Sequence, residues 1–132
     1  MLMQRPRPLR CKTGFTLIEL LVVLSIIGLL LTLAIPRYFV HVEHTKEAAL
    51  KETLAVVRDS LDKYYSDNGK YPNSLDELVE KRYIRKPPYD PVADSASQWI
   101  LIPPPPPALG SVYDLRSGAS GEGTDGTPYR EW

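Results

Sequence analysis

The chain has 132 residues, enough for one small domain and one membrane segment. Its 16 basic and 16 acidic residues cancel in number, but four basic residues and no acid fall within residues 1–14. This asymmetry favours a membrane address over nucleic-acid binding, for which the folded domain itself is basic, so no nucleic-acid partner is expected.

Residues 1–14 form a basic leader that contains Arg5, Arg7, Arg10 and Lys12. Positive charge before an apolar segment holds the N-terminus in the cytoplasm and sends the rest of the chain across the membrane. The one cysteine, Cys11, lies in this leader, so an internal disulfide is excluded. Leucine and arginine precede it where a lipoprotein signal has small residues, and we interpret Cys11 as an incidental leader residue.

Residues 15–36 form an apolar segment in which Glu19 is the only charge. A helix over its 21 residues from Phe15 to Ile35 measures about 31 Å, close to the ~30 Å hydrocarbon core of a bilayer. The segment is longer than the apolar core of a cleaved secretory signal peptide, and no small-residue cleavage site follows it. We therefore expect a single membrane-spanning helix. A carboxylate at bilayer depth costs roughly 2.5–3.5 kcal/mol, so Glu19 needs a partner.

One long helix is predicted over residues 15–66, half in the membrane and half outside it. Pro36 lacks an N–H group and is expected to kink this helix where it leaves the apolar zone. Glu47 and Lys51 are expected to form an i,i+4 ion pair. Asp67-Asn68-Gly69 predicts the helix end. Apolar residues beyond Pro36 recur at helical spacing and predict a stripe that packs on downstream residues. These residues are Leu50, Leu54, Val57, Leu61 and Tyr64.

Residues 37–132 predict a small domain outside the membrane. Ser74 and Glu77 form a capping-box pattern that starts a short helix over residues 75–82.

Two further runs, 99–102 and 111–115, are rich in β-forming residues and predict strands. Between them, five consecutive prolines at 103–107 favour a rigid connector over a docking ligand, since proline donates no ladder hydrogen bond. The fold class is therefore α+β, with one long helix packed on a small antiparallel sheet.

No catalytic constellation is recognisable, so the chain is not expected to be an enzyme. His41 and His44 lie three residues apart beside Glu43, a spacing that can place two imidazoles on one helix face. No third ligand is placed nearby in the sequence, and we interpret the pair as exposed helix surface.

Residues 117–128 are rich in small residues and contain four glycines. Such a loop is either flexible or shaped to bring its backbone close to a ligand. Its side-chain oxygens are of the type that calcium prefers, and the candidate ligands are Ser120, Glu122 and Asp125. Two carboxylates are few for a tight site, so any calcium site here is expected to be weak.

The sequence Gly14-Phe15-Thr16-Leu17-Ile18-Glu19 follows a short basic leader and opens the apolar segment. It resembles the processing signal of type IV pilins and type II secretion pseudopilins. In that family a prepilin peptidase cuts after the glycine and methylates the new N-terminus. The resemblance implies cleavage between Gly14 and Phe15 and methylation of Phe15.

Other stretches are similar to the G-type major pseudopilin of type II secretion, namely residues 64–72, 74–78, 90–91 and 113–115. The resemblance implies a pilin-like fold, an inner-membrane anchor and a periplasmic domain. It further implies a helical pseudopilus that drives export of folded proteins across the outer membrane. The implied partners are copies of the chain itself, the prepilin peptidase, minor pseudopilins and the inner-membrane assembly platform. It also implies calcium at the 117–128 loop, although Ser120 stands where an aspartate is expected.

Two alternatives remain open. The first is a type IV pilin or minor pilin for adhesion, motility or DNA uptake, and the second is a single-span anchored enzyme or binding module. Many type IV major pilins resemble one another in a C-terminal disulfide loop. This chain has no cysteine after Gly14, which favours a pseudopilin.

Cleavage after Gly14 is expected to give Glu19 a partner that the uncut chain lacks. The new amine of Phe15 and the Glu19 carboxylate lie near one face of the first helical turns. The positive end of the helix dipole adds roughly 0.3–1 kcal/mol. We expect the amine to pair with Glu19 of the same chain or of a neighbouring subunit, which makes Glu19 an assembly residue. Pro36 is the second expected assembly residue.

Overall fold

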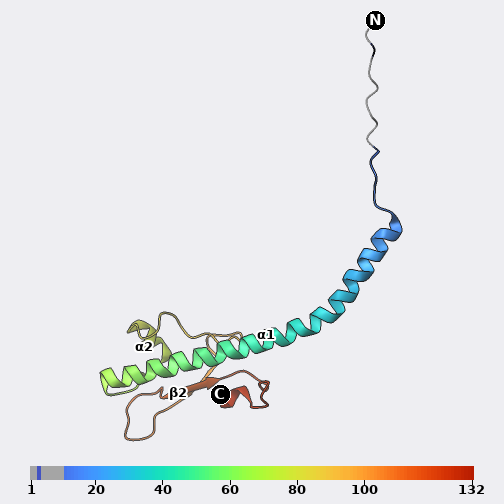
Figure 1. The fold of residues 1–132 in the computed structure, drawn as a ribbon. Helices are drawn as coiled ribbons and strands as arrows, with labels where there is room; N and C mark the ends of the chain where they lie inside the picture. Colours follow the sequence, from blue (N-terminus) through green and yellow to red (C-terminus); the bar gives the residue numbers. More distant parts are fainter. Residues whose placement is uncertain (1–2, 4–10) are drawn as a thin grey trace. The chain divides into compact units, whose positions relative to one another are not determined.

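A computed structural model describes residue 3 and residues 11–132, so the leader residues Arg5, Arg7 and Arg10 lie outside the described part. The elements in chain order are α1 (Leu17–Asn68), α2 (Leu75–Glu80), β1 (Trp99–Ile102), β2 (Asp114–Ser117) and the 3-10 helix η1 (Tyr129–Glu131) (Figure 1). One long helix with a small antiparallel sheet confirms the predicted α+β class. The chain divides into two compact units, Met1–Phe39 and Val40–Trp132. The predicted domain boundary after Pro36 stays a prediction.

The first unit consists, in its described part, of the leader end and the apolar part of α1. Every residue from 11 to 39 is exposed. An 18-residue window of α1 has a mean hydropathy of 2.7, and none of it is buried. By length and composition α1 can therefore cross a membrane. Pro36 lies inside α1, which continues to Asn68, so this proline does not end the helix.

The predicted helix over residues 15–66 is confirmed with both ends moved two residues downstream. Its end follows the predicted stop signal. Gly69 adopts a positive φ of 69°, and its N–H donates to the Tyr65 carbonyl at 2.8 Å. Glycine reaches this left-handed conformation without a steric penalty, which is why it commonly terminates helices.

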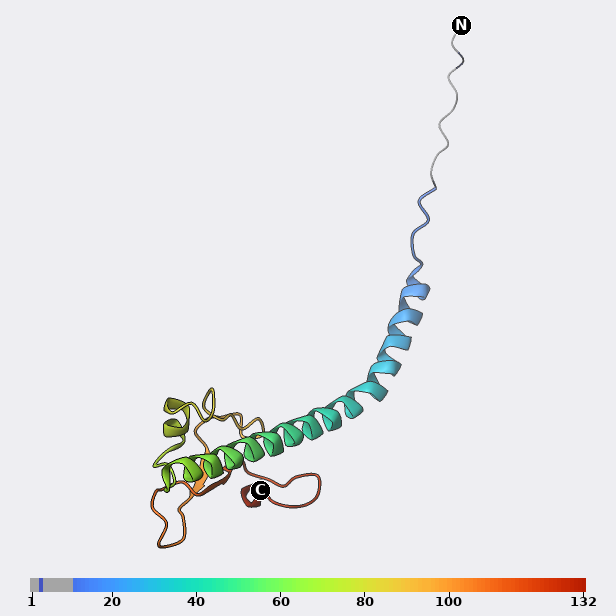
Figure 2. The same cartoon turned by 60° about the vertical axis from the view of Figure 1, so that its left-hand side comes forward.

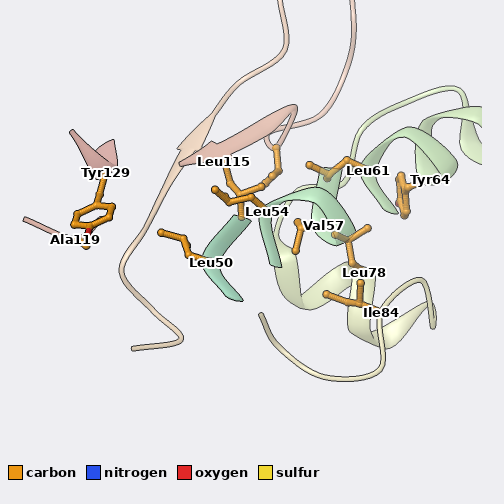
Figure 3. Close-up of a cluster of buried hydrophobic side chains, with 11 residues drawn as sticks. Leu50, Leu54, Val57, Leu61, Tyr64, Leu78, Ile84, Leu115, Ala119 and Tyr129 are labelled. Carbon is orange, nitrogen blue, oxygen red and sulfur yellow. The ribbon is translucent and has the colours of Figure 1, made fainter. Parts of the chain in front are cut away.

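The core of the second unit is built on the predicted stripe of α1, whose five members are all at most 2% exposed. In Figures 1 and 2, α2 lies on one side of the C-terminal part of α1, and β2 and the C-terminal segment lie on another. Figure 3 shows Leu54 beside Leu115 of β2, while Leu78 of α2 lies next to Ile84. The stripe is confirmed as the surface that organises this unit.

The capping box that starts α2 is confirmed, with one difference in its geometry. Ser74 Oγ accepts a hydrogen bond from the Glu77 N–H at 3.3 Å, as the pattern predicts. The Glu77 carboxylate accepts from the Asn73 N–H at 2.8 Å, one residue before the N-cap. It also accepts from the Tyr64 hydroxyl at 2.6 Å, which joins α2 to α1. The helix ends at Glu80, earlier than the predicted residue 82.

The strand predicted over residues 111–115 is wrong in its bounds, because β2 spans Asp114–Ser117. Its antiparallel register places Ile102 opposite Asp114. Prolines follow Ile102 directly, so residues before Tyr113 have no ladder partner in β1. The N–H groups of Ser111 and Val112 instead donate to the Pro72 carbonyl at 3.1 and 3.0 Å. The five prolines form the predicted connector between the two strands.

Candidate functional site

The candidate processing bond, Gly14–Phe15, lies in a stretch without regular secondary structure, residues 11–16. The Phe15 side chain is 90% exposed. A Cβ atom at Gly14 would meet no atom within 4 Å beyond its chain neighbours, so packing does not require glycine at this position. A requirement for glycine would therefore come from an enzyme that reads this bond.

Thr16 and Glu19 form a capping box at the start of α1. The Glu19 N–H donates to Thr16 Oγ1 at 3.2 Å, and the Thr16 N–H donates to Glu19 Oε2 at 3.4 Å. This reciprocal pair satisfies two amide groups that the first turn leaves free, so it fixes where the helix begins. The Thr-x-x-Glu pattern that signals this pair is present in the sequence, but its capping role was not recognised there.

In the uncut chain the Glu19 carboxylate has one long hydrogen bond, from the Thr16 amide, and this amide is not the charged partner expected from cleavage. This bond leaves most of the acceptor capacity of an ionised carboxylate unused. The pairing of Glu19 with a Phe15 amine stays a prediction.

His41, Glu43 and His44 all lie on α1, and all three are exposed. Among residues 3 and 11–132, no three histidine, cysteine, aspartate or glutamate side chains gather in a group that could hold a metal ion. The exposure of the histidine pair agrees with its interpretation as helix surface, and the absence of a metal role stays a prediction.

The glycine-rich C-terminal loop has a defined backbone. Two backbone hydrogen bonds close turns within it. The Gly123 N–H donates to the Thr127 carbonyl at 2.8 Å, and the Gly126 N–H donates to the Gly123 carbonyl at 3.0 Å. The Tyr129 N–H donates back to the Gly121 carbonyl at 3.2 Å. A Cβ on Gly123 would lie 2.4 Å from the Trp132 ring, so any other residue there would displace the ring from its present position.

Glu47 of α1 is buried beneath this loop, with only 6% of its surface exposed. Thr124 donates to the carboxylate from its N–H at 2.9 Å and from its hydroxyl at 2.7 Å. Tyr129 donates from its hydroxyl at 2.9 Å. The predicted Glu47–Lys51 ion pair is therefore wrong. Lys51 Nζ lies instead over the Trp132 ring, 4.6 Å from its centroid.

The contacts of Glu47 shift two pKa values. Burial alone raises the pKa of Glu47, but the hydrogen bonds from Thr124 and Tyr129, with a contribution from the charge of His44, outweigh it and lower the pKa below its usual 4.5. Burial, and then the bond to Glu47, raise the pKa of Tyr129 to about 12. Around neutral pH, Glu47 is therefore an ionised acceptor and Tyr129 a protonated donor.

The three predicted calcium ligands lie at the outer side of the loop. Ser120 and Glu122 are exposed. Asp125 Oδ1 accepts from the Thr127 N–H at 3.0 Å and from its hydroxyl at 2.6 Å, and these bonds lower the pKa of Asp125. As arranged, this set is a poor fit for a calcium ion, because it holds only two carboxylates and one oxygen of Asp125 is already engaged within the loop. Calcium binding itself stays a prediction.

The sequence was compared with known protein families and with known proteins. The family model "Prokaryotic N-terminal methylation motif" matches residues 9–35. The chain is 33% identical over 130 residues to the type II secretion system core protein G of Pseudomonas aeruginosa, a match that covers 86% of this chain and 87% of that protein. It is 29% identical over 133 residues to the protein of the same name from Aeromonas hydrophila, covering 88% and 90%.

A shorter relative carries a different name. The competence protein ComGC of Halalkalibacterium halodurans is 30% identical over 78 residues, which covers 59% of this chain and 76% of that protein. No solved structure matches. The similarity to core protein G spans most of both chains, and the methylation motif covers the start of the apolar helix. The chain therefore belongs to the type II secretion system core protein G family, the major pseudopilins.

Proposed function

We propose that this pseudopilin is cut after Gly14, methylated on Phe15 and polymerised through the apolar part of α1 into a type II secretion pseudopilus. The filament extends from the inner membrane and drives export of folded proteins across the outer membrane. One observation carries the proposal. Every residue in the apolar part of α1 is exposed in the single chain, and most of this part lies within the matched methylation motif, residues 9–35.

An exposed apolar surface of this extent needs a covering, which either lipid or other subunits can supply. Lipid is as apolar as a leucine stripe, so burial alone gives the helix little preference for neighbouring subunits over the membrane. A polar contact therefore has to fix the position of one subunit against the next, and Glu19 carries the only charge available in this segment. Head-to-tail contacts whose rotation does not close produce an open filament.

The same proposal assigns a topology and partners. The basic leader holds the N-terminus in the cytoplasm, and the second unit, Val40–Trp132, lies in the periplasm. The prepilin peptidase acts on the Gly14–Phe15 bond, and the assembly platform and minor pseudopilins receive the mature subunit. The role of the chain is structural, and no catalytic step is assigned to it.

A gene deletion in the native host tests this function. Loss of the chain is expected to leave secreted enzymes in the periplasm, while twitching motility and DNA uptake stay normal. Complementation with the wild-type gene restores secretion. Complementation with Gly14→Val does not, because the uncut chain stays in the membrane. Normal secretion in the deletion strain would overturn the proposal.

A second candidate function is a pilin for DNA uptake, and the similarity to the competence protein favours it. The same deletion strain separates the two candidates. If transformation frequency falls while secretion stays normal, the chain serves DNA uptake and not secretion.

A further inference from the structure

The C-terminal loop of the second unit presents hydrogen-bond donors to α1. Three donors from two residues point at one carboxylate: the N–H and hydroxyl of Thr124 and the hydroxyl of Tyr129. A cation site needs the opposite polarity, because its ligands are oxygens with free lone pairs. The inner face of this loop is therefore built to hold an anion, and the anion present is Glu47.

The C-terminal loop is held by contacts with residues of its own chain. Gly123 admits the Trp132 ring at a distance that no side chain would allow. Trp132 Nε1 donates to Thr127 Oγ1 at 2.7 Å, and the same hydroxyl bonds to Asp125. The Trp132 and Tyr129 rings meet edge to face, with their centroids 5.0 Å apart. These contacts, internal to the C-terminal segment, help to hold its donors in position.

Glu47 and Lys51 are one helical turn apart on α1 and contact this loop and the residues that follow it. Glu47 binds Thr124 and Tyr129, and Lys51 lies over Trp132. A buried carboxylate is tolerated only when hydrogen bonds satisfy it, and here three do. The burial of the Glu47 carboxylate therefore requires the loop donors, and the position of the loop on α1 depends on that carboxylate.

We propose that Glu47 locks residues 121–132, the end of the C-terminal loop with η1 and Trp132, onto α1 in place of a metal ion, so that this pseudopilin holds its C-terminal loop without calcium. Two further observations support the proposal. Asp125 already accepts two hydrogen bonds from Thr127, and the loop presents donors, not acceptors, to α1. The inference concerns the fold of the second unit, and it stands or falls independently of whether the filament serves secretion or DNA uptake.

Hydrogen–deuterium exchange on the full chain in detergent micelles tests the proposal, with calcium or a chelator present. The amides of residues 121–132 are expected to be equally protected in both conditions. Glu47→Gln is expected to speed their exchange about tenfold or more, because the negative charge that strengthens all three bonds is lost and one of the two acceptor oxygens becomes an N–H₂ group. Added calcium is not expected to restore the protection.

The matched control is Glu52→Gln, an exposed glutamate on the same helix, which is expected to leave loop exchange unchanged. If Glu47→Gln also exposes the β1–β2 amides, the variant has unfolded, and Thr124→Val replaces it. That variant removes one hydroxyl donor with little change in shape and is expected to speed exchange in the loop alone.

Two results would overturn the proposal. In the first, calcium increases loop protection in the wild-type chain and Asp125→Asn abolishes the increase, which would establish a metal-held loop. In the second, a folded Glu47→Gln chain keeps full loop protection in chelator, which would show that the carboxylate is not the lock. Calorimetric titration of the wild-type chain with calcium is expected to give no binding heat, and a saturable heat would also count against the proposal.

Discussion

Glu19 has two separable properties, a negative charge and a capping oxygen, and the variant Glu19→Gln removes only the first. Glutamine serves at the third helical position of a capping box as glutamate does, so the start of α1 at Leu17 is expected to persist. Thr16→Val does the reverse, because it removes the hydroxyl that accepts from the Glu19 N–H and leaves the charge. The pair of variants distinguishes an assembly charge from a helix cap.

The two changes are expected to differ in size and in the step affected. Loss of an N-cap side chain costs about 0.5–2 kcal/mol in helix stability. Removal of one partner from a desolvated ion pair costs about 3–5 kcal/mol, which weakens association more than a hundredfold. For membrane insertion, the effect of removing the charge is favourable. An uncharged residue is easier to insert, by up to roughly 2.5–3.5 kcal/mol at the bilayer centre. Glu19→Gln is therefore expected to insert fully and to fail at polymerisation.

The assay follows three steps in cells that lack the wild-type gene. Membrane fractionation measures insertion, gel mobility measures loss of the leader, and enzyme activity in the culture medium measures secretion. Glu19→Gln is expected to be inserted and cut but not to support secretion, while Thr16→Val keeps most secretion and Glu52→Gln keeps all of it. Normal secretion with Glu19→Gln would refute the charge-pair reasoning and leave Glu19 as a helix cap.

Three further predictions concern other parts of the chain. Leu61 is 0% exposed, so Leu61→Ala is expected to lower the free energy of unfolding by about 2–5 kcal/mol in denaturant titration, whereas Leu109→Ala, at a site 69% exposed, changes it by less than about 0.5 kcal/mol. Gly14→Val is expected to block removal of the leader on gels, although the fold has room for it, and unchanged processing would reject the assigned bond. The lowered pKa of Glu47 predicts that loop protection is complete above pH 4.5 and declines as the pH falls through the folded value, while Glu47→Gln shows no such decline.

The features that could be predicted from the sequence are those coded by neighbouring residues. The stripe from Leu50 to Tyr64, the Ser74 cap and the Gly69 stop each depend on spacings of a few residues, and each is present in the structure. The strand at 111–115 was misplaced because β-forming composition does not say which carbonyl an N–H group will reach. Here the Pro72 carbonyl takes the first two N–H groups, and the ladder begins later.

Glu47 was missed for a related reason, since its partners lie 77 and 82 residues away in the sequence. A signal was nevertheless present. Glu47 precedes Leu50 by three residues and Leu54 by seven, so it continues the buried stripe and does not lie on the solvated face. A charge in line with a buried stripe predicts a distant donor, and Thr124 and Tyr129 supply three hydrogen bonds.

The two carboxylates of α1 differ in how much of their acceptor capacity the single chain uses. Glu47 accepts three short bonds and is buried, so little of it remains for another molecule. Glu19 accepts one long bond and is exposed, so it has capacity for an incoming amine. Glu19→Gln is therefore expected to leave loop protection and the thermal unfolding of the second unit unchanged, while Glu47→Gln leaves leader removal unchanged. A Glu47→Gln chain that stays uncut, or a Glu19→Gln chain that loses loop protection, would contradict this division between an assembly charge and a folding charge.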